Sequence, residues 1–175
     1  KEIKYLVTAY KKYKISSYLN TAQKGIDYLL KAQYDNGGWP QYYPDFSSYR
    51  SQITYNDNAM INVLNLLQDV AEGKNDFDVI AGNYKATCLA SVQKGIDCIL
   101  KTQYKQNGVL TVWCAQYNAK TLVPEMARKF ELASLSGSES VGIVRFLMRQ
   151  ENPSKEIIAA VKAAVEWFKK VQIKG

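Results

Sequence analysis

Two short segments of the chain place an acid between amide or hydroxyl side chains. They are Asn56-Asp57-Asn58-Ala59 and Ser138-Glu139-Ser140-Val141. Carboxylates beside amide and hydroxyl oxygens are ligands that suit a hard cation such as Ca²⁺. Each acid taken alone is better explained as a helix start, where a carboxylate interacts favourably with the helix dipole and with unpaired N–H groups. Asp57 and Glu139 are therefore candidate metal ligands if the fold brings their side chains together at one end of the domain.

Two long aromatic loops offer a second kind of chemistry. Residues 35–55 and 106–118 each begin with an Asn-Gly turn and then present Trp and Tyr. Aromatic rings stack on the C–H faces of sugars, and amides hydrogen-bond hydroxyls. For a single aromatic residue, capping of the core is the simpler explanation, but the cluster at equivalent positions favours a sugar-binding groove. The predicted substrate-binding residues are Trp39, Tyr42, Tyr43, Arg50, Asn56, Asn58, Trp113, Gln116 and Lys120.

Three basic side chains, Arg50, Lys120 and Arg128, fall in loops rather than on the predicted helices. A guanidinium can bind a substrate carboxylate through two parallel hydrogen bonds, or it can pair with a carboxylate of the protein itself. Residue type and position leave both roles open.

The composition excludes several classes of enzyme. The chain has 175 residues, 47% of them hydrophobic, and no histidine. Ser-His-Asp and Cys-His hydrolases and zinc hydrolases with imidazole ligands are therefore ruled out, and a proton would be abstracted by Lys, Arg, Tyr or a carboxylate. The three cysteines are an odd number and form no CxxC pair, which argues against a disulfide scaffold.

The formal net charge of +7 favours polyanionic partners, either nucleic acid or an acidic polysaccharide. The basic residues form no stripe interleaved with aromatic residues, so we expect no nucleic-acid partner. No apolar run approaches the roughly 18 residues that span a bilayer, so we also expect no membrane partner.

The elements that must position these side chains follow an internal repeat. Residues 23–34 recur as residues 93–104, at an offset of 70, with nine of the twelve positions identical. A weaker third copy, residues 165–172, aligns with residues 26–33 at an offset of 139. Each copy has apolar residues at the i, i+3, i+4 spacing of an amphipathic helix.

A second helix is predicted after each of the first two copies, from Asp57 to Ala71 and from Ser140 to Gln150. Gly73 is a stop signal for the first of these, and Ser154 is a start signal for the third outer helix. We predict a single all-α domain with repeats near residues 17–72, 84–150 and 154–175. Its expected architecture is a closed or nearly closed (α/α)₃-like toroid of helical hairpins with long rim loops. A stacked solenoid of hairpins is the alternative.

The loop motifs resemble those of the family 10 polysaccharide lyases, the pectate lyases of that class. The resemblance rests on residues 37–44 (GGWPQYYP), 53–60 (ITYNDNAM), 113–117 (WCAQY) and 134–140 (SLSGSES), with Thr121-Leu122, Pro124 and Ala127-Arg128. The motifs cover nearly all of the chain from Asn20 onward. Each alone is weak, but together they are specific.

The resemblance implies an (α/α)₃ toroid that cleaves polygalacturonate by β-elimination, with Ca²⁺ on the uronate carboxylate and an arginine as the base. It makes Asp57 the acid of the family's Asn-Asp motif. It makes Arg128 the arginine of its Ala-Arg motif, a candidate catalytic residue that grips uronate. It also implies secretion to an extracellular or periplasmic setting, and we expect a monomer.

Two departures from the family pattern bear on activity. Family modules are longer, so we expect this chain to be a truncated catalytic module whose base follows Gly175. Asn58 and Asn118 stand where related sequences often have Asp, which would weaken a Ca²⁺ site. A non-catalytic binder of acidic polysaccharide, with the same groove and no base, is therefore the main rival hypothesis. A protein-interaction or nucleic-acid module is the least favoured one.

Overall fold

The structure, a computed structural model, describes residues 1–173, which contain six α-helices. They are α1 (Glu2–Tyr13), α2 (Ser16–Ala32), α3 (Ala59–Glu72), α4 (Ala81–Thr102), α5 (Gly137–Met148) and α6 (Lys155–Val171). The connections contain the 3₁₀ turns η1 (Ser48–Ser51), η2 (Asn56–Asn58) and η3 (Phe77–Val79), and the strands β1 (Ile53–Thr54), β2 (Lys105–Gln106), β3 (Val109–Leu110) and β4 (Gln116–Tyr117). The predicted all-α class is confirmed. None of the helices within residues 1–173 has the length and apolar composition needed to cross a membrane.

Local signals set several helix ends. Gly73 ends α3 in the left-handed conformation, with φ 65°, and its N–H bonds the Val70 carbonyl at 3.2 Å. Ser154 begins α6, where its hydroxyl oxygen accepts a hydrogen bond from the Ile157 N–H at 3.3 Å. The three outer helices α2, α4 and α6 end at equivalent glutamines with extended backbones, namely Gln33, Gln103 and Gln172. The helices of the three repeat copies therefore end with the same residue in the same backbone conformation.

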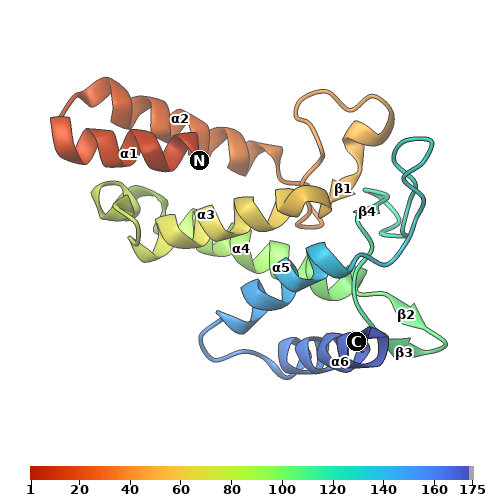
Figure 1. Ribbon diagram of the computed structural model, residues 1–175. Helices are drawn as coiled ribbons and strands as arrows, with labels where there is room; N and C mark the ends of the chain where they lie inside the picture. The colour runs from red at the N-terminus through yellow and green to blue at the C-terminus, as the bar shows by residue number, and fades with distance from the viewer. Residues whose placement is uncertain (174–175) are drawn as a thin grey trace.

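The helices pack as three pairs stacked side by side (Figure 1). α1 lies against α2, α3 against α4 and α5 against α6, with the α3/α4 pair in the middle. The repeating segment of the sequence does not coincide with these packed pairs. It runs from one of the helices α2 and α4, which carry the repeated motif, through a long loop into the following helix. The closely packed partners α3 and α4 are instead joined by the short connection 73–80.

The middle layer carries much of the hydrophobic core. Met60, Leu64 and Leu67 of α3 are fully buried, as expected for a helix that is apolar nearly all round. Gly95 of α4 allows this close packing, because a Cβ there would lie 2.4 Å from Leu64 Cδ2. Burial of each large apolar side chain contributes about 1.5–3 kcal/mol to folding.

Residues 1–173 do not close into the predicted ring. In Figure 1 the α1/α2 pair and the α5/α6 pair lie at opposite ends of an open arc, on either side of the α3/α4 pair. α5 and α6 contact the middle pair through α3 and α4 respectively, and α1 reaches it through η3. A closed toroid is therefore not confirmed.

The two long loops meet at one end of the helices, on the right in Figure 1, and form what we call the rim layer, residues 33–58 and 103–136. β1 of the first loop pairs antiparallel with β4 of the second, with Ile53 opposite Tyr117 and Thr54 opposite Gln116. The loops are also tied by hydrogen bonds from Asn36 to the Ala119 carbonyl (2.6 Å), from Gln52 to the Met126 carbonyl (2.8 Å) and from the Tyr55 N–H to the Ala115 carbonyl (2.8 Å). The two repeats thus share one continuous surface.

Candidate functional site

The two tryptophans of the rim layer are structural. Trp39 is 3% exposed and Trp113 is 0% exposed. Their indole N–H groups donate to the carbonyls of Leu29 and Ile99 respectively, each at 2.8 Å. Leu29 and Ile99 are equivalent repeat positions in the last turns of α2 and α4, where carbonyls lack intrahelical partners. The prediction that Trp39 and Trp113 stack on sugar is corrected: each ring caps a helix end and has no free face.

Two of the repeated glutamines, Gln33 and Gln103, join the rim layer to α4 and α6 respectively. Each side-chain amide donates to a carbonyl of its own loop and to one of a neighbouring helix. Gln33 bonds the Ser91 carbonyl of α4 at 2.9 Å, and Gln103 bonds the Ala160 carbonyl of α6 at 3.0 Å. The identity of these residues in the repeat thus has a structural cause.

Tyr42 is the predicted aromatic residue with the most accessible ring, at 53% exposed. Tyr43 is partly buried and packs edge-on against Tyr28, with ring centroids 5.4 Å apart. The Arg50 guanidinium lies over the Tyr42 ring at 5.7 Å and forms an ion pair with Asp45 at 3.2 Å. Tyr42 and Arg50 therefore form one aromatic and cationic surface on the first loop, with Tyr43 as its support.

A pocket of 190 Å³, which we call the rim pocket, opens where the two loops meet. It is lined by Asn56, Ala115, Gln116, Glu125 and residues 130–134. Gln116 is 6% exposed and is held there by the β1–β4 pairing. The Asn56 amide donates to the Asp57 carboxylate at 3.2 Å. The fold thus brings the predicted residues Asn56 and Gln116 into one pocket, with Asp57 beside it.

Arg128 reaches the rim pocket through Glu131, which lines it. The Glu131 carboxylate accepts hydrogen bonds from Arg128 Nε, at 2.8 Å, and from Arg128 Nη2. This pairing raises the pKa of Arg128 and lowers the pKa of Glu131. Arg128 is therefore held as a cation, which suits binding of a carboxylate and opposes a role as a base. Its guanidinium also lies over the Tyr49 ring at 6.0 Å.

Glu139 is used at the start of α5 rather than in the rim pocket. Its carboxylate accepts a hydrogen bond from the hydroxyl of Ser136, the N-cap residue, with the spacing of a capping box. Asn58, at the start of α3, packs against Gly142, in the middle of α5. The helix-start explanation therefore holds for Glu139, even though α3 and α5 are in contact.

The two predicted metal ligands, Asp57 and Glu139, differ in whether they could hold a cation. Within residues 1–173, no three Asp, Glu, Cys or His side chains converge to hold a metal. The Asp57 side chain is exposed, and in the same part of the structure Oδ1 of the adjacent Asn58 is buried without a hydrogen-bond partner. Ca²⁺ takes about six to eight oxygen ligands, so a site based on Asp57 would need oxygens from substrate and water. The geometry favours Asp57 over Glu139 as a ligand.

A neighbouring pocket of 640 Å³ contains the exposed side chain of Lys120. Glu125 lines both pockets, so they adjoin. Sequence reasoning missed Glu125 and Glu131, as well as Phe130, which is 88% exposed at the rim pocket. The sequence did carry one signal for these residues: two acids and a phenylalanine lie within three positions of Arg128 in a predicted loop.

Solved structures with this arrangement are polysaccharide lyases. A family 10 polysaccharide lyase from Cellvibrio cellulosa matches with a TM-score of 0.89 and 44% sequence identity, over 94% of this chain and 51% of that chain. An aspartate-to-alanine mutant of that lyase, in complex with trigalacturonic acid, matches with the same TM-score of 0.89 and 44% identity, over 94% and 52% of the two chains. This chain spans about half the length of these lyase structures.

The pectic acid lyase family matches residues 1–175, the whole of the chain. A comparison with curated proteins gave no match. The chain belongs to the pectic acid lyase family, and the resemblance carried by its loop motifs is confirmed.

Proposed function

We propose that the protein is a pectate lyase that cleaves polygalacturonate by Ca²⁺-assisted β-elimination. The observation that carries this proposal is the family match over the entire chain, together with the trigalacturonic acid bound by a relative that is 44% identical. The rim layer supplies groups that suit such a polymer: the exposed ring of Tyr42, the cations Arg50, Lys120 and Arg128, and the amides of Asn56 and Gln116. Since pectin is an extracellular polymer, we propose that the protein is secreted. We further propose that it acts as a monomer.

In this reaction a base removes the C5 proton of a uronate, a C4=C5 double bond forms, and the C4–O bond breaks as the leaving sugar departs. Ca²⁺, when bound, would neutralise the uronate carboxylate and acidify the C5 proton. Asp57 is the residue of this chain that would hold the cation. Arg128 would bind a uronate carboxylate in place of Glu131, because both carboxylates match its two-pronged donor geometry.

The test is the ultraviolet absorbance of unsaturated products from polygalacturonate, with Ca²⁺ and after chelation. We expect product formation that stops on chelation and in Asp57→Asn, which removes the charge and keeps the shape. Lys162→Gln, on the exposed surface of α6, is the control and should leave the rate unchanged. Activity that persists in full after chelation would refute the Ca²⁺ requirement, and the absence of unsaturated product from a chain extended past Gly175 would refute lyase activity.

Binding of acidic polysaccharide without cleavage is the second candidate function. It is favoured by one observation: Glu131 holds the predicted catalytic residue Arg128 as a cation, so Arg128 does not provide a base. This function predicts salt-sensitive retention on immobilised galacturonan with no unsaturated product. Retention together with turnover would exclude it.

A further inference from the structure

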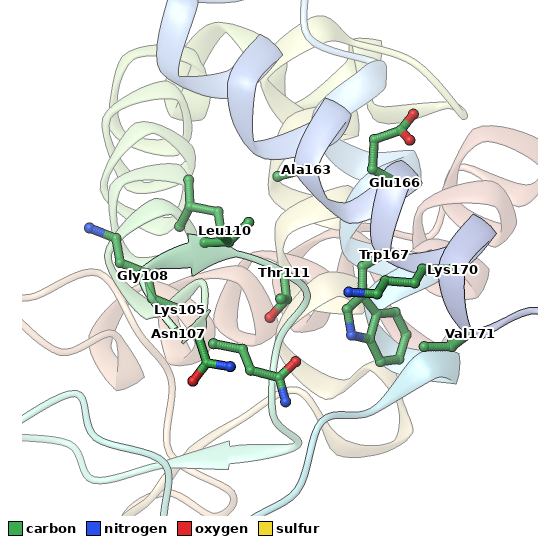
Figure 2. Close-up of a pocket in the computed structure, with 12 residues that line it drawn as sticks. Lys105, Asn107, Gly108, Leu110, Thr111, Ala163, Glu166, Trp167, Lys170 and Val171 are labelled. Carbon is green, nitrogen blue, oxygen red and sulfur yellow. The ribbon is translucent and has the colours of Figure 1, made fainter.

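A third pocket, of 890 Å³, lies between the β2–β3 hairpin and the C-terminal half of α6 and shares no lining residue with the rim pocket. Figure 2 shows Trp167 and Lys170 of α6 on one side of it, and Lys105 and Asn107 of the hairpin on the other. We call it the hairpin pocket. None of the roles proposed above uses it.

The hairpin pocket exists because the second rim loop is longer than the first. Six positions separate Gln33 from Trp39, whereas ten separate the equivalent Gln103 from Trp113. The additional residues form the β2–β3 hairpin, with Lys105 opposite Leu110. The pocket is therefore a feature of one repeat and not a general gap between repeats.

The turns of the two loops show the difference in space. In the first loop Gly37 lies directly on α4, because a Cβ there would be 1.9 Å from the Lys94 carbonyl oxygen. In the second loop the turn is Asn107-Gly108, with φ of 52° and 81°, as two-residue hairpins require. A Cβ on Gly108 would meet no atom within 4 Å. The tip of the hairpin thus stands free while β3 lies against α6, and the groove opens between the hairpin and the helix.

Trp167 lines this groove at a repeat position where α4 has a fully buried residue. The offsets of the repeat align Trp167 with Cys98, which is 0% exposed. Trp167 is partly exposed, and its ring is braced edge-on by Phe168, with centroids 5.6 Å apart. Of the three tryptophans, Trp39 and Trp113 are buried, so Trp167 alone presents its ring to solvent.

The charges around Trp167 favour an anion. Lys105 and Lys170 line the pocket with one acid, Glu166, and that carboxylate is already paired with Lys169 at 2.8 Å. Within the described chain, neither Lys105 nor Lys170 takes part in an ion pair. Two ammonium groups therefore line the pocket without a carboxylate partner among the described residues, Lys170 on the side of the indole ring and Lys105 on the hairpin across the groove (Figure 2).

We infer that the hairpin pocket binds a short segment of an acidic oligosaccharide, separately from the rim pocket. The indole of Trp167 would stack on the C–H face of a sugar ring and Lys170 would bind its carboxylate. Across the groove, Lys105 and the Asn107 amide would bind a carboxylate and hydroxyls of a neighbouring ring. The choice of galacturonate as the sugar rests on the proposed function. The need for an anionic sugar rests on the lysines and Trp167 alone.

The experiment is a titration of the intact protein with trigalacturonate, followed by intrinsic tryptophan fluorescence and by acrylamide quenching. Because Trp39 and Trp113 are buried, a change in quenching reports on Trp167. We expect a saturable, salt-sensitive change with protection from acrylamide. Lys105→Gln and Lys170→Gln should each weaken it at least about fivefold, because each removes a charged hydrogen bond. Lys162→Gln, on the same helix but outside the pocket, and the neutral sugar maltotriose are the controls.

Asp57→Asn separates this site from the proposed lyase activity, because it should abolish cleavage and keep the Trp167 signal. Unchanged quenching at saturating trigalacturonate, or equal affinity in the Lys105→Gln and Lys170→Gln variants, would overturn the inference. Trp167 already shielded from acrylamide in the sugar-free protein would also overturn it, since another segment or a second copy would then cover the groove. A Trp167 signal without any lyase activity would refute the proposed function and support this site.

Discussion

Gly142 of α5 lies directly against Asn58 at the start of α3, so that a Cβ on Gly142 would be 2.2 Å from Asn58 Oδ1. The contact joins the start of α3 to the middle of α5, two helices of successive repeats, and Asp57 directly precedes Asn58. Asn58 itself has a positive φ of 57°, which Asn tolerates better than most residues. This close approach adds to the β1–β4 pairing that joins the two repeats beside the rim pocket.

Gly142→Ala should therefore destabilise the protein by about 1–3 kcal/mol in urea unfolding, because the added methyl group overpacks the junction. Gly137→Ala, in the same helix, is the matched control: a Cβ there meets nothing within 4 Å, and stability should be unchanged or slightly higher. Asn58→Gly removes the opposing oxygen and keeps the positive φ accessible. In that background Gly142→Ala should cost much less, and an equal cost in both backgrounds would contradict the contact.

Arg128→Ala should weaken binding of oligogalacturonate by at least about tenfold in calorimetric titration, because it removes a charge-assisted bond to a uronate carboxylate. Glu131→Gln tests the same contact in the other direction. It frees Arg128 from its partner in the rim pocket, so affinity should rise. Arg145→Ala, an exposed arginine on α5, should have no effect. An unchanged dissociation constant in Arg128→Ala would count against its role.

Substitution of Trp39 should lower stability and substitution of Tyr42 should lower galacturonate affinity. The reason is that the buried Trp39 ring caps a helix, whereas the Tyr42 ring is exposed to solvent. Trp39→Phe removes the indole bond to the Leu29 carbonyl and should lower stability by about 1–3 kcal/mol, with galacturonate affinity kept. Tyr42→Ala should leave stability within about 0.5 kcal/mol and weaken galacturonate binding several-fold. Thermal unfolding and calorimetric titration of both variants check this. Loss of affinity in Trp39→Phe at unchanged stability would restore the stacking role that its burial contradicts.

The buried cysteines should be unreactive in the folded protein. Burial raises the pKa of Cys88 and of Cys98 from 9.0 to about 11, and it also raises the pKa of Cys114. Few thiolates are then present at about pH 8, so a disulfide reagent such as DTNB should react quickly only after unfolding, since the thiolate is the nucleophile. Rapid labelling of the native protein would refute this.

The same groups should make stability fall at alkaline pH. The folded state keeps its thiol protons above pH 9.0, where the unfolded chain releases them, so the unfolded state is favoured as pH rises from 9.0 to about 11. Urea unfolding across this range measures the effect. Cys98→Ser should reduce the slope, and a slope unchanged by that substitution would assign the loss of stability to other groups.

The features that depend on neighbours within a few residues were predictable from the sequence. The spacing of apolar residues identified the helices, and Gly73 and Ser154 marked ends that the structure reproduces. The repeat placed the two loops at equivalent positions, and its motifs identified the family. These signals act over one or two helical turns, so each can be recognised without knowing how the chain folds back on itself.

The direction in which the loop side chains point depended on contacts between distant residues. Trp39 points inward because the Leu29 carbonyl at the end of α2 lacks another partner within residues 1–173, and Asn36 bonds the Ala119 carbonyl of the other loop. Asn56 and Gln116 came to one pocket only through the β1–β4 pairing between repeats. How the helix pairs stack likewise depends on small angles added over many interfaces. No local pattern of residues records those angles, so only the tertiary structure could decide them.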